Sequence, residues 1–322
     1  MNQAPTADAG DNIEILSEDQ ACTTILGMAT DSDGDVIEYQ WLEEGVLLLD
    51  WTPVGPDGEA SLDLGTLPCF SVGDHTLALK VSDGDLVASE EMILTVDNSP
   101  PVAVPAPLSQ LVKIGIDPIT VVADVSDFDG NLVAFEWRKE PEILHSGIVS
   151  PPQGGGTVPV PDLFVPAGDV RFPVGVHSIE LRVSDGVNDA VSVFVSAEVI
   201  DSIAPTLAPV PSATILWPPN HQLQLVTIWA NALDNGGGTI HLDVSVESSE
   251  PPDADGDGNT IPDHEVVSVD DVTGVIELLL RSERSGKGDG RTYIIVITAT
   301  DASGNCTQGV LEILAPHDKR KS

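Results

Sequence analysis

Residues 31–41 read Asp-Ser-Asp-Gly-Asp-Val-Ile-Glu-Tyr-Gln-Trp, and residues 127–137 read Asp-Phe-Asp-Gly-Asn-Leu-Val-Ala-Phe-Glu-Trp. Both stretches begin with Asp-x-Asp-Gly and end on tryptophan, and the second lies 96 residues after the first. A shorter motif repeats at the same offset, because Asn2-Gln3-Ala4-Pro5 returns as Asn98-Ser99-Pro100-Pro101. Features that keep one register over so long a stretch indicate an internal repeat.

Later parts of the chain extend this repeat. Residues 75–84 match residues 177–186 at an offset of 102, and both stretches end in Val-Ser-Asp-Gly. A third, diverged copy begins with a further linker motif at 201–205 and contains the matching strand at 293–301. The sequence therefore predicts three domains, which are residues 1–98, 99–201 and 202–322.

Within each copy the apolar residues alternate with polar ones. Leu77, Leu79 and Val81 are spaced by two, which is the period of a half-buried β-strand. The 29 Gly and 25 Pro residues supply frequent turns. We expect an all-β protein made of three tandem Ig-like antiparallel β-sandwiches in a rod-like array, with Trp41 and Trp137 between the sheets.

The charge balance excludes some classes of partner. The chain has 52 acidic and 13 basic side chains, a formal net charge of −39. Nucleic-acid binding and docking on anionic membranes both need clustered Lys and Arg, so neither is expected. The sequence contains no run of 18 apolar residues, so it does not predict a membrane-spanning helix. Residues 1–10 lack the pattern of a signal peptide, so we expect a mature form or an excised fragment.

The first two copies resemble PKD-type immunoglobulin-like domains, extracellular β-sandwiches marked by Asp-x-Asp-Gly, an aromatic-x-Trp pair and a later Val-x-Asp. The matching residues are Asp31, Asp33, Gly34, Tyr39, Trp41, Val81 and Asp83, then Asp127, Asp129, Gly130, Phe135, Trp137, Val183 and Asp185. The family often continues Trp-Asp-Phe-Gly-Asp-Gly, which residues 41–45 and 137–140 do not match. The third copy resembles a bacterial surface-protein Ig-like module with motifs at 216–221, 281–286 and 300–305. These resemblances imply an extracellular or cell-surface protein of a bacterium or archaeon.

Carboxylates two residues apart in a glycine-containing turn can direct their oxygens at one cation. Ca²⁺ takes six to eight oxygen ligands in flexible geometry, which such turns provide. PKD-type domains in some bacterial enzymes bind calcium with this arrangement, so the resemblance implies a site in each copy. The candidate ligands are Asn2, Asp31, Asp33 and Asp83 in the first, Asn98, Asp127, Asp129 and Asp185 in the second, and Asp201, Asp234 and Asp301 in the third. The alternative is a set of plain acidic turns.

The third copy contains a further acidic loop with calcium-loop spacing. Its candidate ligands are Asp253, Asp255, Asp257, Asn259 and Asp263. The twelfth position is His264 instead of the bidentate Glu of an EF-hand, so a helix pair is not implied. We expect a loop that binds calcium between two strands, with a solvated acidic loop as the alternative.

Catalysis is not predicted. The sequence has neither Gly-x-Ser-x-Gly nor His-Glu-x-x-His. His75 and His177 recur at one strand position, which favours a structural role for these histidines.

The three cysteines lack Cys-x-x-Cys spacing. Whether Cys22 and Cys69 form a disulfide stays open, and Cys306 is expected to be a buried thiol.

We therefore expect an extracellular, calcium-stabilised structural or adhesive protein that binds several calcium ions and no other cofactor. Residues 319–321 are Lys-Arg-Lys, and this basic end could meet the acidic first turn of another copy to build a filament. Two alternatives are a non-catalytic spacer and a glycan-binding accessory region of a larger secreted enzyme. Exposure of Trp51, Trp217 and Trp229 in one plane would favour glycan binding, whereas their burial would favour the structural role. The possible partners are therefore another copy of the chain or a cell-surface or matrix glycan or protein.

Overall fold

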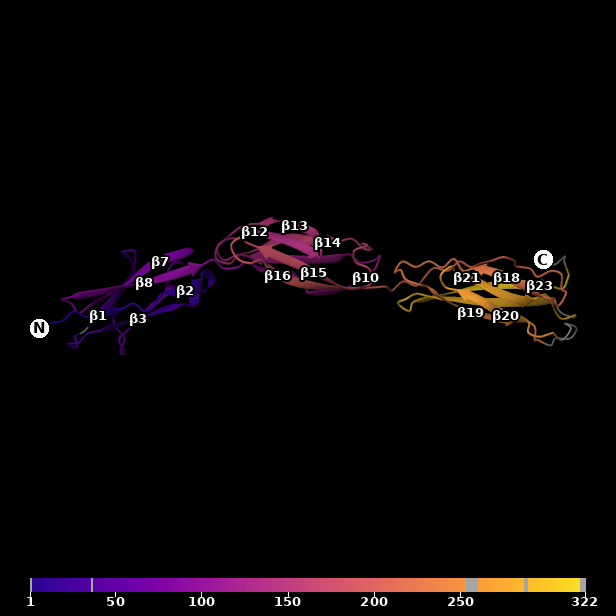
Figure 1. The fold of residues 1–322 in the computed structure, drawn as a ribbon, viewed down its shortest axis with the longest axis horizontal. Coiled ribbons are helices and arrows are strands. Elements are labelled where there is room, and N and C mark those ends of the chain that lie inside the picture. Colours follow the sequence, from indigo (N-terminus) through magenta and orange to yellow (C-terminus); the bar gives the residue numbers. More distant parts are fainter. Residues whose placement is uncertain (1, 36, 253–259, 287–288, 319–322) are drawn as a thin grey trace. The chain divides into compact units, whose positions relative to one another are not determined.

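The computed structural model describes residues 2–35, 37–252, 260–286 and 289–318 (Figure 1). Strands dominate, and the described helices are two short 3-10 turns, Ser17–Cys22 and Leu64–Thr66. Neither is long and apolar enough to cross a bilayer. The chain divides into two compact units, one of residues 1–109, 120–164 and 178–196 and the other of the remainder. The sheets nevertheless fall into three consecutive pairs, which we describe one at a time.

Two sheets form from the first 98 residues. Their strands are β1 (Thr6–Asp8), β2 (Ile13–Leu16), β3 (Thr24–Thr30), β4 (Glu38–Glu43), β5 (Val46–Pro53), β6 (Glu59–Asp63), β7 (Gly73–Ser82) and β8 (Val87–Asp97). One sheet has the order β1-β3-β6 and the other β2-β8-β7-β4-β5. The paired strands of these two sheets are antiparallel, except β2 and β8, which are parallel. The short strand β2 lies along β8 at the edge of the second sheet.

The next pair of sheets repeats this topology. Its strands are β9 (Val102–Ala106), β10 (Ser109–Lys113), β11 (Ile119–Ser126), β12 (Val133–Lys139), β13 (Glu142–Val149), β14 (Thr157–Val165), β15 (Gly175–Ser184) and β16 (Val191–Ile200). The sheet orders are β14-β11-β9 and β10-β16-β15-β12-β13, which correspond strand for strand to the first pair. The repeat found in the sequence is thus a repeat of topology.

The third pair has a related but different arrangement. Its strands are β17 (Val210–Pro211), β18 (Leu223–Trp229), β19 (His241–Ser248), β20 (His264–Asp270), β21 (Val275–Arg281), β22 (Gly290–Thr300) and β23 (Cys306–Pro316). The orders are β17-β18-β21-β20 and β19-β22-β23. β20 pairs with β21, whereas its counterparts β5 and β13 pair with β4 and β12. The third copy thus differs from the first two in topology as well as in sequence.

The cores lie between the paired sheets, where the sequence predicts them. Trp41 and Trp137 are fully buried, as expected for aromatics that fill the space between sheets. Each indole N–H donates to a backbone carbonyl of the facing sheet, Ala60 for Trp41 (3.0 Å) and Pro161 for Trp137 (3.2 Å). The prediction of an all-β fold with tandem Ig-like sandwiches is confirmed. The exact domain boundaries at 98/99 and 201/202 stay predictions.

We expect Trp41→Ala to lower the free energy of unfolding of the first sandwich by about 3–5 kcal/mol, because it leaves a cavity and an unpaired Ala60 carbonyl. Trp51→Ala is the control, since Trp51 on β5 is 39% exposed and its removal should cost at most about 1 kcal/mol. Urea denaturation followed by hydrogen exchange of β3 amides measures both. Equal losses would contradict the assignment of Trp41 as the central core residue.

Candidate functional site

The strand before each acidic turn directs the first aspartate toward the core. Along β11 the side chains of Ala123 and Val125 are buried, and Asp127 follows at the same spacing of two. Alternate residues of a strand face the same side, so the Asp127 carboxylate continues the row of core side chains past the strand end. The same spacing leads from Ala29 on β3 to Asp31. These aspartates are therefore drawn inward by the strand itself.

In each sandwich a later strand of the opposite sheet, β7, β15 or β22, also ends in a row of buried side chains that an aspartate continues. Val81, Val183 and Ala299 are the last buried residues of β7, β15 and β22. Two residues later stand the remaining carboxylates, Asp83, Asp185 and Asp301. Because β3 and β7 end at one pole of the sandwich, and β11 and β15 likewise, each sandwich gathers its aspartates beside the linker that enters it. We call these groups sites 1, 2 and 3, with the ligands predicted above.

Site 1 contains one more carboxylate than the sequence analysis proposed. Oxygens of Asp31, Asp33 and Asp35 lie within 4.8 Å of one another. Asp31 Oδ1 accepts the backbone N–H of Asp33 (2.7 Å), whereas its buried Oδ2 has no hydrogen-bond partner among the described residues. The linker closes over the turn, since Gln3 N donates to Asp33 Oδ2 (2.7 Å). Asp35 was missed because the motif's signature ends at Gly34.

The other part of site 1 is Asp83. Its Oδ1 accepts the backbone N–H groups of Leu86 (2.6 Å) and Asp85 (2.8 Å), which lower the pKa of this exposed carboxyl. Asn2 Nδ2 donates to Asp83 Oδ2 (3.0 Å). Asn2 thus presents its nitrogen to Asp83, and it could bind a cation through Oδ1 only after its amide turns over.

Site 2 repeats these contacts in a more enclosed form. Asn98 Nδ2 donates to Asp185 Oδ2 (2.7 Å), and Ser99 N donates to Asp129 Oδ2 (2.7 Å). Two asparagines outside the predicted set complete it. Asn131 Nδ2 donates to Asn98 Oδ1 (2.5 Å), and Asn188 Nδ2 donates to the Asn98 carbonyl (3.0 Å). Nothing in their local spacing marks these two residues, and only the fold brings them to the linker.

Asp127 is the most constrained carboxylate of site 2. The residue is 1% exposed, and its Oδ2 has no hydrogen-bond partner within the described chain. Burial raises the pKa of Asp127, and the charges of Asp129 and Asp185 raise it further, against the N–H of Asn131 (3.0 Å). A buried carboxylate oxygen without a partner is costly in the absence of a counter-charge.

Site 3 is built from three carboxylates. Oxygens of Asp201, Asp234 and Asp301 lie within 4.8 Å of one another. Asp234 Oδ2 accepts Gly236 N (2.8 Å), while its buried Oδ1 has no partner in the described part of the chain. A Cβ at position 236 would lie 2.0 Å from Asp201 Oδ2, so glycine there leaves room for this carboxylate in the site. The loss of Asp-x-Asp in this copy therefore does not separate the predicted ligands.

Asp301 is held firmly within site 3. Its Oδ1 accepts Ser303 N and Asn305 N, both at 2.8 Å, and Asn305 Nδ2 donates to its Oδ2 (2.9 Å). Burial acts to raise the pKa of Asp301, but these hydrogen bonds together lower it. Asp301 therefore stays ionised and is available to a cation.

The predicted acidic loop can be followed only at its end. Asp253, Asp255, Asp257 and Asn259 lie outside the described residues, so their prediction is not tested. Asp263 is described, and its carboxylate forms an ion pair with Arg291 through Oδ2. Its buried Oδ1 has no hydrogen-bond partner among the residues described. Burial raises the pKa of Asp263 to about 6, with Arg291 opposing the rise and Glu283 adding to it.

Arg291 belongs to a buried charge network at the opposite end of β22 from site 3. Its guanidinium lies 3.4 Å from Glu283 Oε1 and 3.5 Å from Glu250 Oε2, and the side chains of Arg291 and Glu283 are fully buried. Thr260 Oγ1 donates to Glu283 Oε2 (2.5 Å). Tyr293 Oη, also buried, donates to the carbonyls of Arg281 (2.9 Å) and Asp263 (3.1 Å).

This network joins two motifs that the sequence analysis left without a role, residues 216–221 and 281–286. Arg281 Nη1 donates to the His221 carbonyl (2.8 Å), and Ser282 Oγ donates to the Pro218 carbonyl (2.7 Å). His221 Nδ1 lies 3.2 Å from Glu283 Oε2. The two motifs thus hold the segment before β18 against the segment after β21. Their role is structural in these contacts.

We expect Arg291→Met to lower the stability of the third sandwich by about 3–5 kcal/mol, because it leaves Asp263 and Glu283 buried with too little positive charge. Arg182→Met, at an exposed position of β15, should change stability by about 0.5 kcal/mol or less. Hydrogen exchange in urea measures both variants, at β22 amides for Arg291→Met and at β15 amides for the control. If Arg291→Met leaves the stability of the third sandwich unchanged, the Arg291 guanidinium does not compensate buried negative charge in this network.

The remaining histidines and cysteines are as follows. His75 and His177 each pack edge-on against a phenylalanine, Phe70 and Phe172, in equivalent positions. These contacts agree with their predicted structural role. Cys22, Cys69 and Cys306 are free and exposed. The expectation of a buried Cys306 is wrong, because the first residues of β23 alternate at its solvent-facing end.

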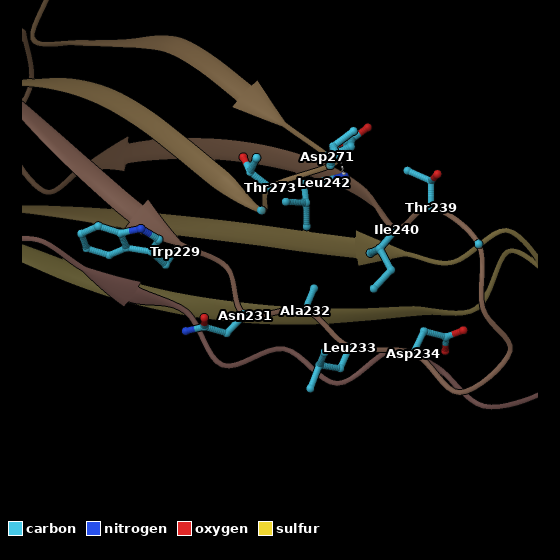
Figure 2. A pocket seen from close by; sticks show the side chains of 13 residues that line it. Trp229, Asn231, Ala232, Leu233, Asp234, Thr239, Ile240, Leu242, Asp271 and Thr273 are labelled. Carbon is cyan, nitrogen blue, oxygen red and sulfur yellow. Dashed lines mark hydrogen bonds between the residues drawn. The ribbon is translucent and has the colours of Figure 1, made fainter.

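A cavity of about 420 Å³ lies at the site 3 end of the third sandwich. Figure 2 shows Trp229 at one end and Asp234 toward the other, with Ile240 and Leu242 between them. Asp271 lies on the rim, where His241 lowers its pKa by a hydrogen bond (2.8 Å). Trp51, Trp217 and Trp229 are 39%, 38% and 45% exposed.

No protein-family model matches the sequence, and no curated protein matches it. Among solved structures, an I-band fragment of titin aligns at 11% identity over 96% of this chain and 97% of that one, with a TM-score of 0.39. A 1.5-MDa bacterial ice-binding adhesin aligns at 14% identity over 98% of both chains (TM-score 0.39). Cadherin domains 1–4 of a protocadherin align at 13% identity over 97% and 76% (TM-score 0.36). Because these TM-scores are below 0.5, the similarities assign neither a family nor an activity.

Proposed function

We propose that this chain is an extracellular, non-catalytic structural or adhesive protein whose tandem sandwiches are stabilised by calcium. The observation that carries the proposal is the same in all three sandwiches. One aspartate of each site keeps one buried oxygen without a hydrogen-bond partner in the described chain. These oxygens are Asp31 Oδ2, Asp127 Oδ2 and Asp234 Oδ1.

The chemistry of the donor set favours calcium over other cations. The sites offer carboxylate and carbonyl oxygens together with asparagine amides, and hard oxygen ligands are what Ca²⁺ prefers. Loop ligands from a linker and two strand ends suit its flexible coordination better than the strict octahedron of Mg²⁺. A bound cation would also relieve the repulsion among Asp201, Asp234 and Asp301. The alternative of plain acidic turns gives no account of the unpartnered oxygens.

An extracellular location would supply calcium at the concentration that such sites need. Extracellular modules bind calcium with dissociation constants of about 10⁻⁴–10⁻³ M. At about 1 mM calcium each site would then add about 0.4–1.4 kcal/mol to the free energy of unfolding. Several such sites would offset part of the self-repulsion of a chain with net charge −39.

Calcium is therefore expected to raise the midpoint of thermal unfolding, and a chelator to lower it again. Differential scanning calorimetry at constant ionic strength, with Mg²⁺ as the matched ion, separates specific binding from screening. An unchanged midpoint in calcium would refute the proposal.

Asp127→Asn gives a sharper experiment, because we expect the variant to be more stable than the parent in chelator but to gain less stability than the parent from calcium. In chelator it removes a buried unpaired charge, so the second sandwich should become more stable. In calcium it removes a ligand, so the gain from the ion should shrink by roughly the contribution of one site. The control Asp124→Asn, exposed on the same strand, should do neither. A loss of stability in both conditions would mean that Asp127 has a purely structural role.

End-to-end association through the basic end remains part of the proposal. Its acidic half at site 1 is described, whereas residues 319–321 lie outside the part of the chain that the structure describes. The PKD-type assignment likewise stays a proposal that rests on the sequence motifs. A spacer role within a larger secreted enzyme would use the same calcium sites.

Glycan binding is a second candidate function, favoured by the exposure of the three tryptophans. Trp229 is the last residue of β18, a strand of about 20 Å. Trp217 precedes this strand, and its neighbour Pro218 is bound by Ser282 near the start of β18, so the two indoles do not form one platform. The cavity beside Trp229 is the better candidate, since it combines an exposed indole and an apolar floor with polar groups at Asn231 and Thr273 (Figure 2). The net charge of −39 favours a neutral polysaccharide.

We expect Trp229→Ala to abolish retardation of the protein in affinity electrophoresis on neutral polysaccharides, while Trp51→Ala retains it. If the parent protein migrates unretarded on every neutral polysaccharide, this second candidate is excluded.

A further inference from the structure

Ser99 is completely buried although it belongs to the linker between β8 and β9. Linker residues normally lie at the surface, where water satisfies their polar groups. A buried hydroxyl must instead find its partners within the protein. The partners of Ser99 lie on both sides of the linker.

On one side, Ser99 contacts site 2 through its backbone. Its N–H donates to Asp129 Oδ2 at 2.7 Å. The first copy has the same bond, from Gln3 N to Asp33 Oδ2 at 2.7 Å. This backbone contact is thus a repeated feature of the linker and its acidic turn.

On the other side, Ser99 contacts the 3-10 turn Ser17–Cys22 through its hydroxyl. Ser99 Oγ lies 2.8 Å from Ser17 Oγ and accepts the backbone N–H of Glu18 at 3.1 Å. Among the described residues Gln3 has no corresponding contact, since its exposed side chain accepts a hydrogen bond from Ser32 Oγ (3.4 Å) within its own sandwich. The hydroxyl contact therefore distinguishes this linker from the one that enters the first sandwich.

We propose that Ser99 is a positioning residue that couples cation binding at site 2 to the Ser17–Cys22 turn. A cation that orders Asp129 also orders the Ser99 backbone, and with it the direction of the hydroxyl. Ordering that hydroxyl strengthens its hydrogen bonds to Ser17 and to the Glu18 amide. Calcium at site 2 thereby stabilises a turn that contains none of its ligands. This inference rests on the proposed calcium function and adds a route by which occupancy is transmitted.

The Glu18 amide reports this coupling directly. In the full chain, calcium should slow its hydrogen exchange by about 2- to 10-fold, the effect of one net hydrogen bond. The Ile93 amide, which donates to Asn12 Oδ1 (2.7 Å) and has no contact with Ser99, serves as the reference within the same sandwich. NMR-detected exchange with and without calcium measures both amides.

Variants separate the coupling from calcium binding itself. Ser99→Ala should leave calcium affinity, measured by isothermal titration calorimetry, within about 3-fold, since its backbone N–H remains, yet it should abolish the response of Glu18. Ser17→Ala should weaken that response if the Ser99 variant proves unstable. Asp129→Asn should also abolish it, whereas the matched change Asp33→Asn at site 1 should leave it intact.

Two failures of this experiment have different meanings. If calorimetry detects no calcium binding that depends on Asp129, the proposed calcium function fails at site 2 and the coupling fails with it. If calcium binds but Glu18 exchange is unchanged, or if Ser99→Ala still responds, the coupling alone is overturned.

Discussion

The alternation of buried and exposed side chains along the central strands determines where Asp83, Asp185 and Asp301 lie, one from each of sites 1, 2 and 3. β7, β15 and β22 each bury every second residue up to a final apolar position, and a carboxylate occupies the next position of that row. A slip of one residue in register would turn both the core residues and the carboxylate to the other face. Core packing and ligand placement therefore depend on one constraint. This constraint explains why the acidic residues occur at the strand ends and point inward.

The third sandwich deals with buried charge in two different ways at the two ends of β22. At one end, Arg291 lies among Asp263, Glu283 and Glu250, so the protein itself supplies a compensating positive charge. At the other end, Asp301 lies near two further aspartates with no arginine in the group that the structure describes. Compensation from within gives a rigid structural network. Site 3 lacks such an arginine among the described residues, so a cation from solution can compensate its negative charge. The stability of that end of the sandwich would therefore depend on the cation concentration.

The linkers connect these local arrangements to one another. In the first two copies a backbone N–H of the entering segment donates to the second aspartate of the turn, Asp33 or Asp129. The segment and the turn therefore order together. Only Ser99 adds a buried hydroxyl that reaches a neighbouring turn. The backbone contact to the second aspartate occurs in both copies, whereas the Ser99 hydroxyl connects it to the Ser17–Cys22 turn in one of them.

The sequence alone determined the fold class, the repeat and most members of each candidate site. Those features depend on local periodicity and on short motifs, so the burial of Trp41 and Trp137 and the spacing of Asp127 from the β11 core row could be read from residues close in the chain.

Only the tertiary structure decided which distant residues contact these sites. Asn131, Asn188 and Ser99 join site 2 by contacts across about 30 to 90 residues. Likewise, the motifs at 216–221 and 281–286 meet because β18 and β21 pair, and Asp263 turns toward Arg291 because β20 changes sheets. Such long-range contacts leave no periodic trace in the sequence, since pairing and packing between distant strands bring these residues together.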